Sequence, residues 1–199
     1  RCGEDAGRAQ SANTLLFDPG GWIGESTDGG GLVGDLERLG FVFSGSTICL
    51  LGAGGAAAGV LAALLRQEPE TVVIANRTVE RATELAASHS DLGPVRACGL
   101  DEISGAAPFD LLINATSQGH DGGAPAVNPS WFAQGALCYD MNYGTASRPL
   151  SEVCGESGIA YSDGLGMLVG QAALSFRMWT GKNPDTGAVL DRLRRSAGK

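Results

Sequence analysis

A glycine-rich turn after Leu51 is the segment of this sequence best suited to bind phosphate. Residues 52–57 read Gly-Ala-Gly-Gly-Ala-Ala and follow the pattern G-x-G-x-x-A. In such a turn the first glycine permits a tight bend, the second lets the backbone approach a pyrophosphate, and the small last residue lets a helix pack closely on a strand. The N–H groups and dipole at the start of that helix attract the phosphates. The pattern predicts a dinucleotide site at Gly52, Ala53, Gly54, Gly55 and Ala56.

The residues after the next apolar run indicate which dinucleotide binds. Segment 71–75 is followed by Asn76, Arg77 and Thr78, with Arg81 one helical turn further on. Units that bind NAD usually place an Asp or Glu directly after this strand to accept hydrogen bonds from the ribose 2′-hydroxyl. Here two guanidinium groups could hold a 2′-phosphate instead. The sequence therefore favours NADP, and the alternative is a solvated helix start capped by Thr78.

The composition describes a globular chain and argues against several kinds of partner. With 199 residues, of which 43% are hydrophobic and 18% charged, the chain has room for one domain and parts of a second. A net charge of −8 argues against a nucleic-acid partner, and no apolar run is long enough to suggest a membrane partner. Five cysteines without a C-x-x-C spacing, and no signal peptide, predict a reduced, cytoplasmic protein without a metal site.

Short apolar segments alternate with segments of helical spacing in the central part of the chain. The predicted strands are 47–51, 71–75, 95–98, 110–114, 136–140 and 159–162. Helices are expected from the glycine turn to Arg66, over 79–87 and over 149–157. This alternation predicts an α/β fold with a Rossmann-like, doubly wound parallel sheet. In such sheets ligands bind at the carboxyl ends of the strands.

Elements outside this unit indicate a second, smaller lobe. Segments 12–17 and 22–24 are expected to form a hairpin, and 32–39 a helix ended by Gly40. The last long helix, 167–180, carries an apolar stripe. Because the six-strand unit is already complete, that stripe must pack on something beyond the sheet.

Seven blocks resemble the shikimate dehydrogenase family, and they follow one another in the family's order. The blocks are Ala12-Asn13-Thr14, Thr27-Asp28-Gly29, Gly52 to Ala56, Asn76-Arg77-Thr78 with Arg81, Asn114-Ala115-Thr116-Ser117, Tyr139 to Tyr143, and Asp163 to Leu168 with Gln171. The resemblance implies an oxidoreductase that uses NADP to reduce 3-dehydroshikimate to shikimate, its small-molecule substrate, in aromatic amino-acid biosynthesis. It also implies two lobes with the site between them: 1–28 in the substrate lobe, 29–163 as the NADP-binding domain, and 164–199 as helices returning to the substrate lobe.

The resemblance assigns roles to individual residues. Asn13, Asp28 and Gln171 would bind the substrate's hydroxyls, and Tyr143 would lie near its carboxylate. Asn76, Arg77, Thr78 and Arg81 would join the glycine turn in holding the phosphates and adenosine of NADP. The nicotinamide end would be lined by Thr116, Met141 and Gly164. Asp28 would be the catalytic residue, working with a lysine in proton transfer.

That lysine has no counterpart in the matching region. The only lysines, Lys182 and Lys199, follow the last block, and the family's early serines are also absent. We expect both to belong to a substrate lobe that is mostly missing from these residues, so that the chain binds NADP without turnover. His120, in a glycine-rich loop, is a weaker candidate for proton transfer, and Asp28 has an alternative role as a helix N-cap.

Two other functions stay open from the sequence. One is a quinate/shikimate dehydrogenase that uses NAD or NADP, and the other is a non-catalytic NADP-binding fragment. The expected assembly is a monomer or a homodimer.

Overall fold

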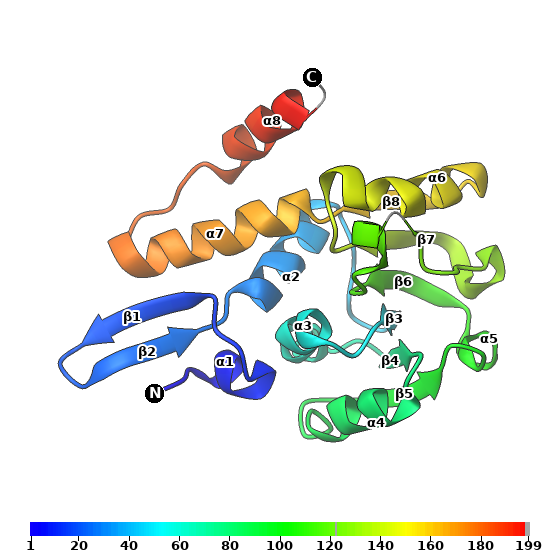
Figure 1. The fold of residues 1–199 in the computed structure, drawn as a ribbon, viewed down its shortest axis with the longest axis horizontal. Coiled ribbons are helices and arrows are strands. Elements are labelled where there is room, and N and C mark those ends of the chain that lie inside the picture. The colour runs from blue at the N-terminus through cyan, green and yellow to red at the C-terminus, as the bar shows by residue number, and fades with distance from the viewer. Residues whose placement is uncertain (122, 198–199) are drawn as a thin grey trace.

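A parallel sheet of six strands forms the centre of the molecule (Figure 1). The computed structural model describes residues 1–121 and 123–197. The strands are β3 (Thr47–Leu51), β4 (Thr71–Asn76), β5 (Val95–Gly99), β6 (Phe109–Asn114), β7 (Phe132–Asp140) and β8 (Ala160–Asp163). Their order is β5-β4-β3-β6-β7-β8, and all neighbours are parallel. The order reverses between β3 and β6, so the prediction of a doubly wound, Rossmann-like sheet is confirmed.

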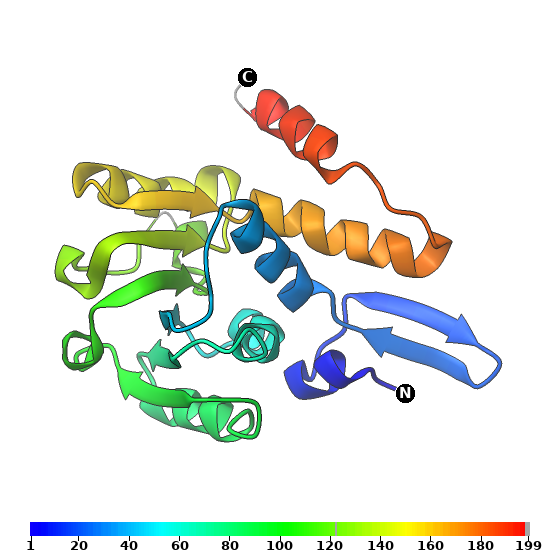
Figure 2. The ribbon, with the colours of Figure 1, turned by 180° about the vertical axis from the view of Figure 1, so that it is seen from behind.

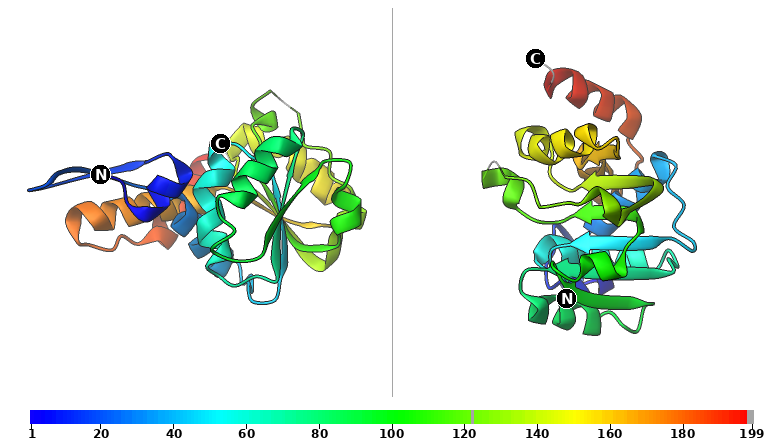
Figure 3. Two further views of the ribbon diagram at one scale, coloured as in Figure 1. Left: turned by 90° about the horizontal axis from the view of Figure 1, so that it is seen from below. Right: turned by 90° about the vertical axis from the view of Figure 1, so that its right-hand side faces the viewer.

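Helices cover both faces of the sheet because successive side chains of each buried strand point to opposite sides (Figure 3). On one face, residues such as Ile48 and Leu50 pack with α2 (Asp28–Arg38), α3 (Gly55–Leu65), α4 (Val79–Ala87) and the start of α7 (Leu165–Thr180). On the other face, Cys49 and Leu51 pack with α5 (Ile103–Ala106), α6 (Arg148–Glu156) and the short turn of helix η2 (Pro129–Trp131). Two further short helices, η1 (Gln118–Asp121) and η3 (Gly144–Ser147), follow β6 and β7.

A hairpin and its neighbouring helices lie beside the sheet domain. Strands β1 (Thr14–Asp18) and β2 (Gly21–Glu25) pair antiparallel, and they extend away from the sheet next to the C-terminal end of α7 (Figures 1 and 2). The Trp179 indole donates a hydrogen bond to the carbonyl oxygen of Leu15 at 3.0 Å, which joins α7 to β1. The last helix, α8 (Thr186–Ala197), lies along the outside of α7.

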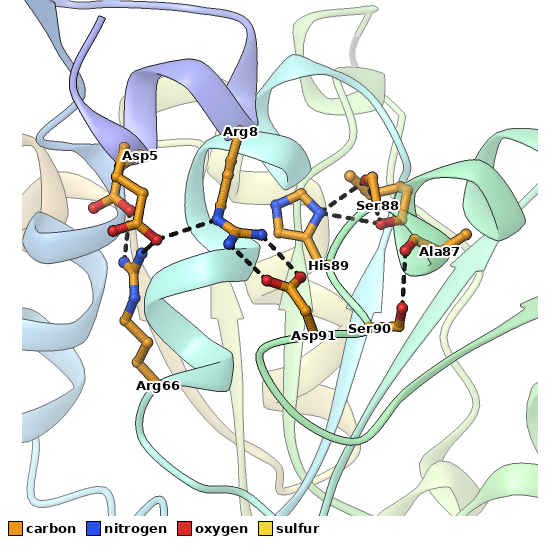
Figure 4. A network of polar contacts seen from close by, with 10 residues as sticks. Asp5, Arg8, Arg66, Ala87, Ser88, His89, Ser90 and Asp91 are labelled. Carbon is orange, nitrogen blue, oxygen red and sulfur yellow. Dashed lines mark hydrogen bonds and ion pairs between the residues drawn. The ribbon is translucent and has the colours of Figure 1, made fainter.

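The first helix, α1 (Glu4–Ala9), is held to the sheet domain by ion pairs (Figure 4). Arg8 of α1 contacts Asp91 at 2.7 Å. Arg66, at the end of α3, contacts both Glu4, at 2.8 Å, and Asp5. These guanidinium groups hold the pKa of the Glu4 and Asp91 carboxyls below their ordinary values through hydrogen bonds and charge. α1 therefore ties the hairpin side of the molecule to α3 and to the loop after α4.

Helices α2 and α7 cross at very short range because glycines form the contact. A Cβ added to Gly31 would lie 2.7 Å from the backbone nitrogen of Gln171 and 2.8 Å from the carbonyl oxygen of Met167. A Cβ on Gly170 would lie 3.2 Å from the carbonyl oxygen of Gly31. Only residues without a side chain permit this approach. The crossing brings the beginning of α2 next to the middle of α7.

Several element boundaries differ from the sequence-based predictions. The prediction of 79–87 is reproduced by α4, whereas α2 begins at Asp28 rather than at residue 32. The run of three glycines after Asp28 has low helix propensity, so only packing against α7 and α3 explains the earlier start. No helix among residues 1–121 and 123–197 is long and apolar enough to cross a membrane. The five cysteines are free, and Cys49 and Cys138 are buried in the sheet.

Candidate active site

The glycine turn has the geometry of a phosphate cradle. Gly52 has a φ of +105°, which L side chains rarely adopt, and a Cβ there would lie 3.1 Å from the carbonyl oxygen of Ala115. A Cβ on Gly54 or Gly55 would meet nothing within 4 Å. Gly54 is the N-cap of α3, and no side chain caps that helix. The first N–H groups of α3 therefore face open space, as an anion requires.

A cavity of about 580 Å³ runs along this turn at the carboxyl ends of β3, β4 and β6. The residues that line it are Leu51 to Ala56, Ala75, Asn76, Arg77, Leu100, Ala115 to Gln118, Pro125, Ala126 and Trp131. Its size lies within the range of cofactor sites, and its position is the switch point of the strand order. The residues present therefore fit a dinucleotide.

The polar residues after β4 divide into two groups. Asn76 and Arg77 line the cavity, whereas Thr78 and Arg81 are exposed nearby and are not among its lining residues. The Asn76 side-chain amide donates to the carbonyl oxygen of Thr78 at 2.8 Å, which orders the loop. Thr78 is the N-cap residue of α4, as the alternative expected, although its side chain makes no capping hydrogen bond. In the part of the chain that the structure describes, neither arginine forms an ion pair.

The three residues expected at the nicotinamide end lie together. Thr116 lines the cavity, and its carbonyl oxygen accepts a hydrogen bond from the Asn142 side chain at 3.0 Å. The Gly164 N–H donates to the carbonyl oxygen of Asn142 at 2.9 Å. A Cβ on Gly164 would lie 2.3 Å from the carbonyl oxygen of Met141, so this position requires glycine. Asn142 thus joins the loops that carry all three, although the sequence suggested no role for it.

The residues expected to bind substrate also meet. The Asn13 side-chain amide donates to Asp28 Oδ1 at 2.8 Å and to Gln171 Oε1 at 3.2 Å. Asn13 Oδ1 accepts hydrogen bonds from the Thr27 backbone N–H and hydroxyl, both at 3.1 Å. This polar cluster lies where β1, the beginning of α2 and α7 come together. It brings side chains from three distant parts of the sequence within hydrogen-bonding reach of one another.

Three buried hydroxyls support this cluster, and sequence reasoning missed them. Thr14 Oγ1 lies 2.6 Å from Ser175 Oγ, and Thr27 Oγ1 lies 3.1 Å from the same atom. Thr14 and Thr27 adjoin Asn13 and Asp28 in the blocks quoted above, and that adjacency was the available signal. Ser175 lies one helical turn after Gln171, and the stripe pattern of α7 offered no hint of it.

Asp28 is the first residue of α2, after the N-cap Thr27, so its predicted alternative role as the N-cap is wrong. Its carboxylate lies against the nucleotide helix: a Cβ added to Gly59 of α3 would be 3.4 Å from Asp28 Oδ2. The polar cluster is therefore adjacent to α3, whose N-terminus borders the cavity at the glycine turn.

Tyr143 lies apart from this cluster. It is half exposed and lines a separate hollow of about 940 Å³ with Asp163 and Leu165. Among the described side chains no hydrogen bond joins Tyr143 to Asn13 or Gln171. Its contact with a substrate carboxylate stays a prediction.

The remaining candidates for proton transfer and metal binding contribute little. Lys182 is exposed beyond the end of α7, and Lys199 lies outside the described residues. The side chain of His120 also lies outside what the structure describes. Within residues 1–121 and 123–197, no three His, Cys, Asp or Glu side chains are grouped so that they could bind a metal ion.

Comparison with known proteins finds two matching family models. Residues 36–121 match the model described as Shikimate / quinate 5-dehydrogenase, and residues 164–194 match the Shikimate 5′-dehydrogenase C-terminal domain. Shikimate dehydrogenase (NADP(+)) of Dechloromonas aromatica is 44% identical over 196 residues, which cover 98% of this chain and 71% of the relative. The enzyme of that name from Aeromonas hydrophila is 46% identical over 195 residues, again 71% of its length.

Solved structures with a similar fold include enzymes of this family. An Ael1 enzyme from Pseudomonas putida has a TM-score of 0.88 and 36% identity over 97% of this chain and 71% of that one. Shikimate 5-dehydrogenase from Thermus thermophilus, solved with NADP(H) and shikimate, has a TM-score of 0.79 and 31% identity over 98% of this chain and 71% of that one.

Proposed function

The chain belongs to the shikimate dehydrogenase family, and we propose that it catalyses the reversible, NADP-dependent reduction of 3-dehydroshikimate to shikimate. The observation that carries this proposal is the adjacency of two sites. Asn13, Asp28 and Gln171 form one polar cluster. Asp28 packs against α3, and the N-terminus of α3 lines the cavity suited to a dinucleotide. A substrate hydroxyl held by the cluster is therefore next to the cofactor.

NADP would be held by the glycine turn and by Asn76, Arg77, Thr78 and Arg81. Thr116, Met141 and Gly164 would face its nicotinamide end. When bound, this cofactor supplies or accepts the hydride that interconverts ketone and alcohol. The two arginines favour NADP over NAD because their guanidinium groups match the geometry and charge of a 2′-phosphate.

The polar cluster would orient the substrate and transfer the proton of its reacting hydroxyl. Asn13 and Gln171 offer an amide donor and acceptors that suit vicinal hydroxyls, and Asp28 takes or returns the hydroxyl proton. A solvated carboxylate alone is too weak a base near neutral pH, and a neighbouring ammonium group would make the pair effective. Lys182 is remote from this role: Gln171 lies about 14 Å of helix before the end of α7 at Thr180, and Lys182 follows that end.

We therefore propose that these 199 residues bind NADP but require an ammonium group from outside them for turnover. In this proposal residues 1–28 and 164–199 contribute to the substrate lobe and residues 29–163 form the NADP-binding domain. The exposed apolar side chains of the hairpin, Leu15, Phe17 and Trp22, support its assignment to a separate lobe. The five free cysteines favour a reducing cytoplasm.

Quinate is the second candidate substrate, because the matching family model is described for shikimate and quinate alike. A quinate enzyme that uses NAD would not need Arg77. The cofactor experiment below therefore tests the alternative of a quinate enzyme that uses NAD.

The test measures binding of NADPH and NADH by nucleotide fluorescence in the parent chain and in the variant Arg77→Ala. A charged hydrogen bond to the 2′-phosphate contributes about 1.5–3 kcal/mol, so NADPH binding should weaken by roughly 10- to 100-fold while NADH binding stays the same. Arg192→Ala, which removes the same charge from exposed α8, is the control and should change neither. Equal loss for both nucleotides would contradict the 2′-phosphate role.

The same samples are then mixed with NADP and shikimate, and NADPH formation is followed. Binding without turnover is expected. Turnover would show that no external ammonium group is needed. Absence of both binding and turnover would contradict the cofactor assignment itself.

A further inference from the structure

Asp140 is a buried carboxylate at the point where β7 ends, and no role in the reaction has been assigned to it. The residue is 1% exposed. Its Oδ1 accepts three hydrogen bonds: from the Asn114 side-chain amide at 2.9 Å, the Asn142 backbone N–H at 3.0 Å and the Asn142 side-chain amide at 2.9 Å. Its Oδ2 accepts one from the Tyr161 hydroxyl at 3.4 Å. Burial raises the pKa of this carboxyl, and the donors oppose that rise.

The donors around Asp140 lead directly to Thr116. Asn114 turns its oxygen toward Thr116 and accepts from the Thr116 backbone N–H at 3.0 Å and from its hydroxyl at 2.7 Å. Asn142 donates to the Thr116 carbonyl oxygen at 3.0 Å. Two asparagines that are oriented by one carboxylate therefore hold the N–H, the hydroxyl and the carbonyl of Thr116.

The same arrangement reaches the other two residues of the nicotinamide end. Met141 lies between Asp140 and Asn142 in the chain, and its N–H donates to the Asn114 carbonyl oxygen at 3.0 Å. The carbonyl oxygen of Asn142 accepts from the Gly164 N–H at 2.9 Å. Asp140 is thus the shared acceptor for Asn114, Asn142 and Tyr161, and Asn142 extends this network to the loop after β8.

We propose that Asp140 is a positioning residue for the cofactor: through Asn114 and Asn142 it fixes Thr116, Met141 and Gly164 against the nicotinamide end. This inference rests on the proposed use of NADP. The adenosine end would be held by separate residues after β4, and within residues 1–121 and 123–197 no hydrogen bond joins those residues to this network. Loss of Asp140 should therefore affect one end of the cofactor and not the other.

The conservative variant Asp140→Asn should preserve the arrangement. Its side-chain oxygen would keep the three hydrogen bonds of Oδ1, and its amide would donate to the Tyr161 oxygen in place of the bond at Oδ2. The Tyr161 hydroxyl would still donate to the Ser147 carbonyl oxygen, now 3.0 Å away. Because the role is geometric rather than one of charge, we expect this variant to bind like the parent chain.

The experiment compares two probes in the full chain: NADPH, and adenosine 2′,5′-bisphosphate, which lacks the nicotinamide end. For Asp140→Ala we expect NADPH binding to weaken about tenfold and bisphosphate binding to stay within about twofold. Asp140→Asn should leave both unchanged. Asn142→Ala, a half-buried loop residue, should reproduce the NADPH loss and serves as the second variant if Asp140→Ala does not fold.

Asp110→Ala is the matched control. Asp110 lies at the opposite end of the sheet, near the start of β6, where its Oδ2 accepts from the Thr47 N–H at 2.8 Å and from its hydroxyl at 2.9 Å. Its loss should lower the melting temperature but change neither binding constant. This separates a general loss of stability from a loss of positioning.

The proposal would be overturned if Asp140→Ala weakened the binding of NADPH and of the bisphosphate equally, since the loss of a merely structural residue would affect the whole cavity. No weakening would overturn it too, as would an Asp140→Asn variant that behaves like Asp140→Ala. If the parent chain binds the bisphosphate but not NADPH, the nicotinamide end is misassigned and the proposal falls. If it binds neither, the proposed NADP function itself fails.

Discussion

Replacing Gly31 by alanine tests how tightly α2 and α7 cross beside the polar cluster of Asn13, Asp28 and Gln171. The new methyl group would lie 2.7–2.8 Å from Gln171 N, Gln171 Cβ and Met167 O. Two of these are backbone atoms of α7, so no side-chain rotation relieves the contact, and the helices must separate. Such separation would move Gln171 away from Asn13 and Asp28.

The expected magnitude follows from two opposing effects. Overpacking of a tight interior costs about 1–3 kcal/mol and sometimes more, and the backbone contacts place Gly31→Ala toward the upper end of that range. Alanine is favoured over glycine in a helix by about 1 kcal/mol, which offsets part of the cost. The free energy of unfolding should therefore fall by roughly 1–2 kcal/mol.

Gly34, three residues further along α2, provides the matched control. A Cβ there would meet nothing within 4 Å, so only the helix propensity changes. Gly34→Ala should raise the free energy of unfolding by about 0.5–1 kcal/mol. The two variants should then differ by roughly 1.5–3 kcal/mol, or about 3–12 °C in melting temperature for a chain of this size.

Urea unfolding followed by circular dichroism measures both values, and the slope m should stay the same in all three proteins. The reasoning would be refuted if Gly31→Ala were as stable as Gly34→Ala. It would also be refuted if the m-value of Gly31→Ala were about twice that of the parent, because a change in m reports a different unfolded or native state rather than a looser helix crossing.

Two further predictions concern buried polar groups. His89 is fully buried, its Nε2 lacks a partner among the described residues, and the ring lies beside Arg8 of α1 and Asp91 (Figure 4). Burial lowers the pKa of His89 below 6.5, so the stability contributed by the neutral ring is present above pH 6.5 and is lost on acidification. Between about pH 7.5 and 5.5 the melting temperature of His89→Gln should therefore drop less than that of the parent. Asn13→Ala leaves the buried Thr27 N–H without its acceptor and should cost about 1–3 kcal/mol in urea unfolding, while NADPH binding stays unchanged because the cofactor cavity is separate.

The parts of the fold that depend on local pattern could be predicted from the sequence. Each buried strand of the parallel sheet is a short apolar run between turn residues, so β3 and β4 were recognisable without any partner. The phosphate cradle was recognisable for the same reason, since the turn after Leu51 needs glycine at its first position whatever surrounds it. The resemblance of ordered blocks added the set of residues that should share a site.

Tertiary structure alone decided how those residues meet. Asn13 and Gln171 are separated by 158 positions, and their hydrogen bond exists because Gly31 lets α2 approach the backbone of α7. The same crossing makes the glycine-rich start of α2 helical against its low propensity. In the sequence Asp140 is only the last residue of a predicted strand. The four donors that bond to it come from β6, from β8 and from the loop after β7. Hydrogen bonds between distant segments depend on which strands are neighbours, and spacing along one chain carries no record of that.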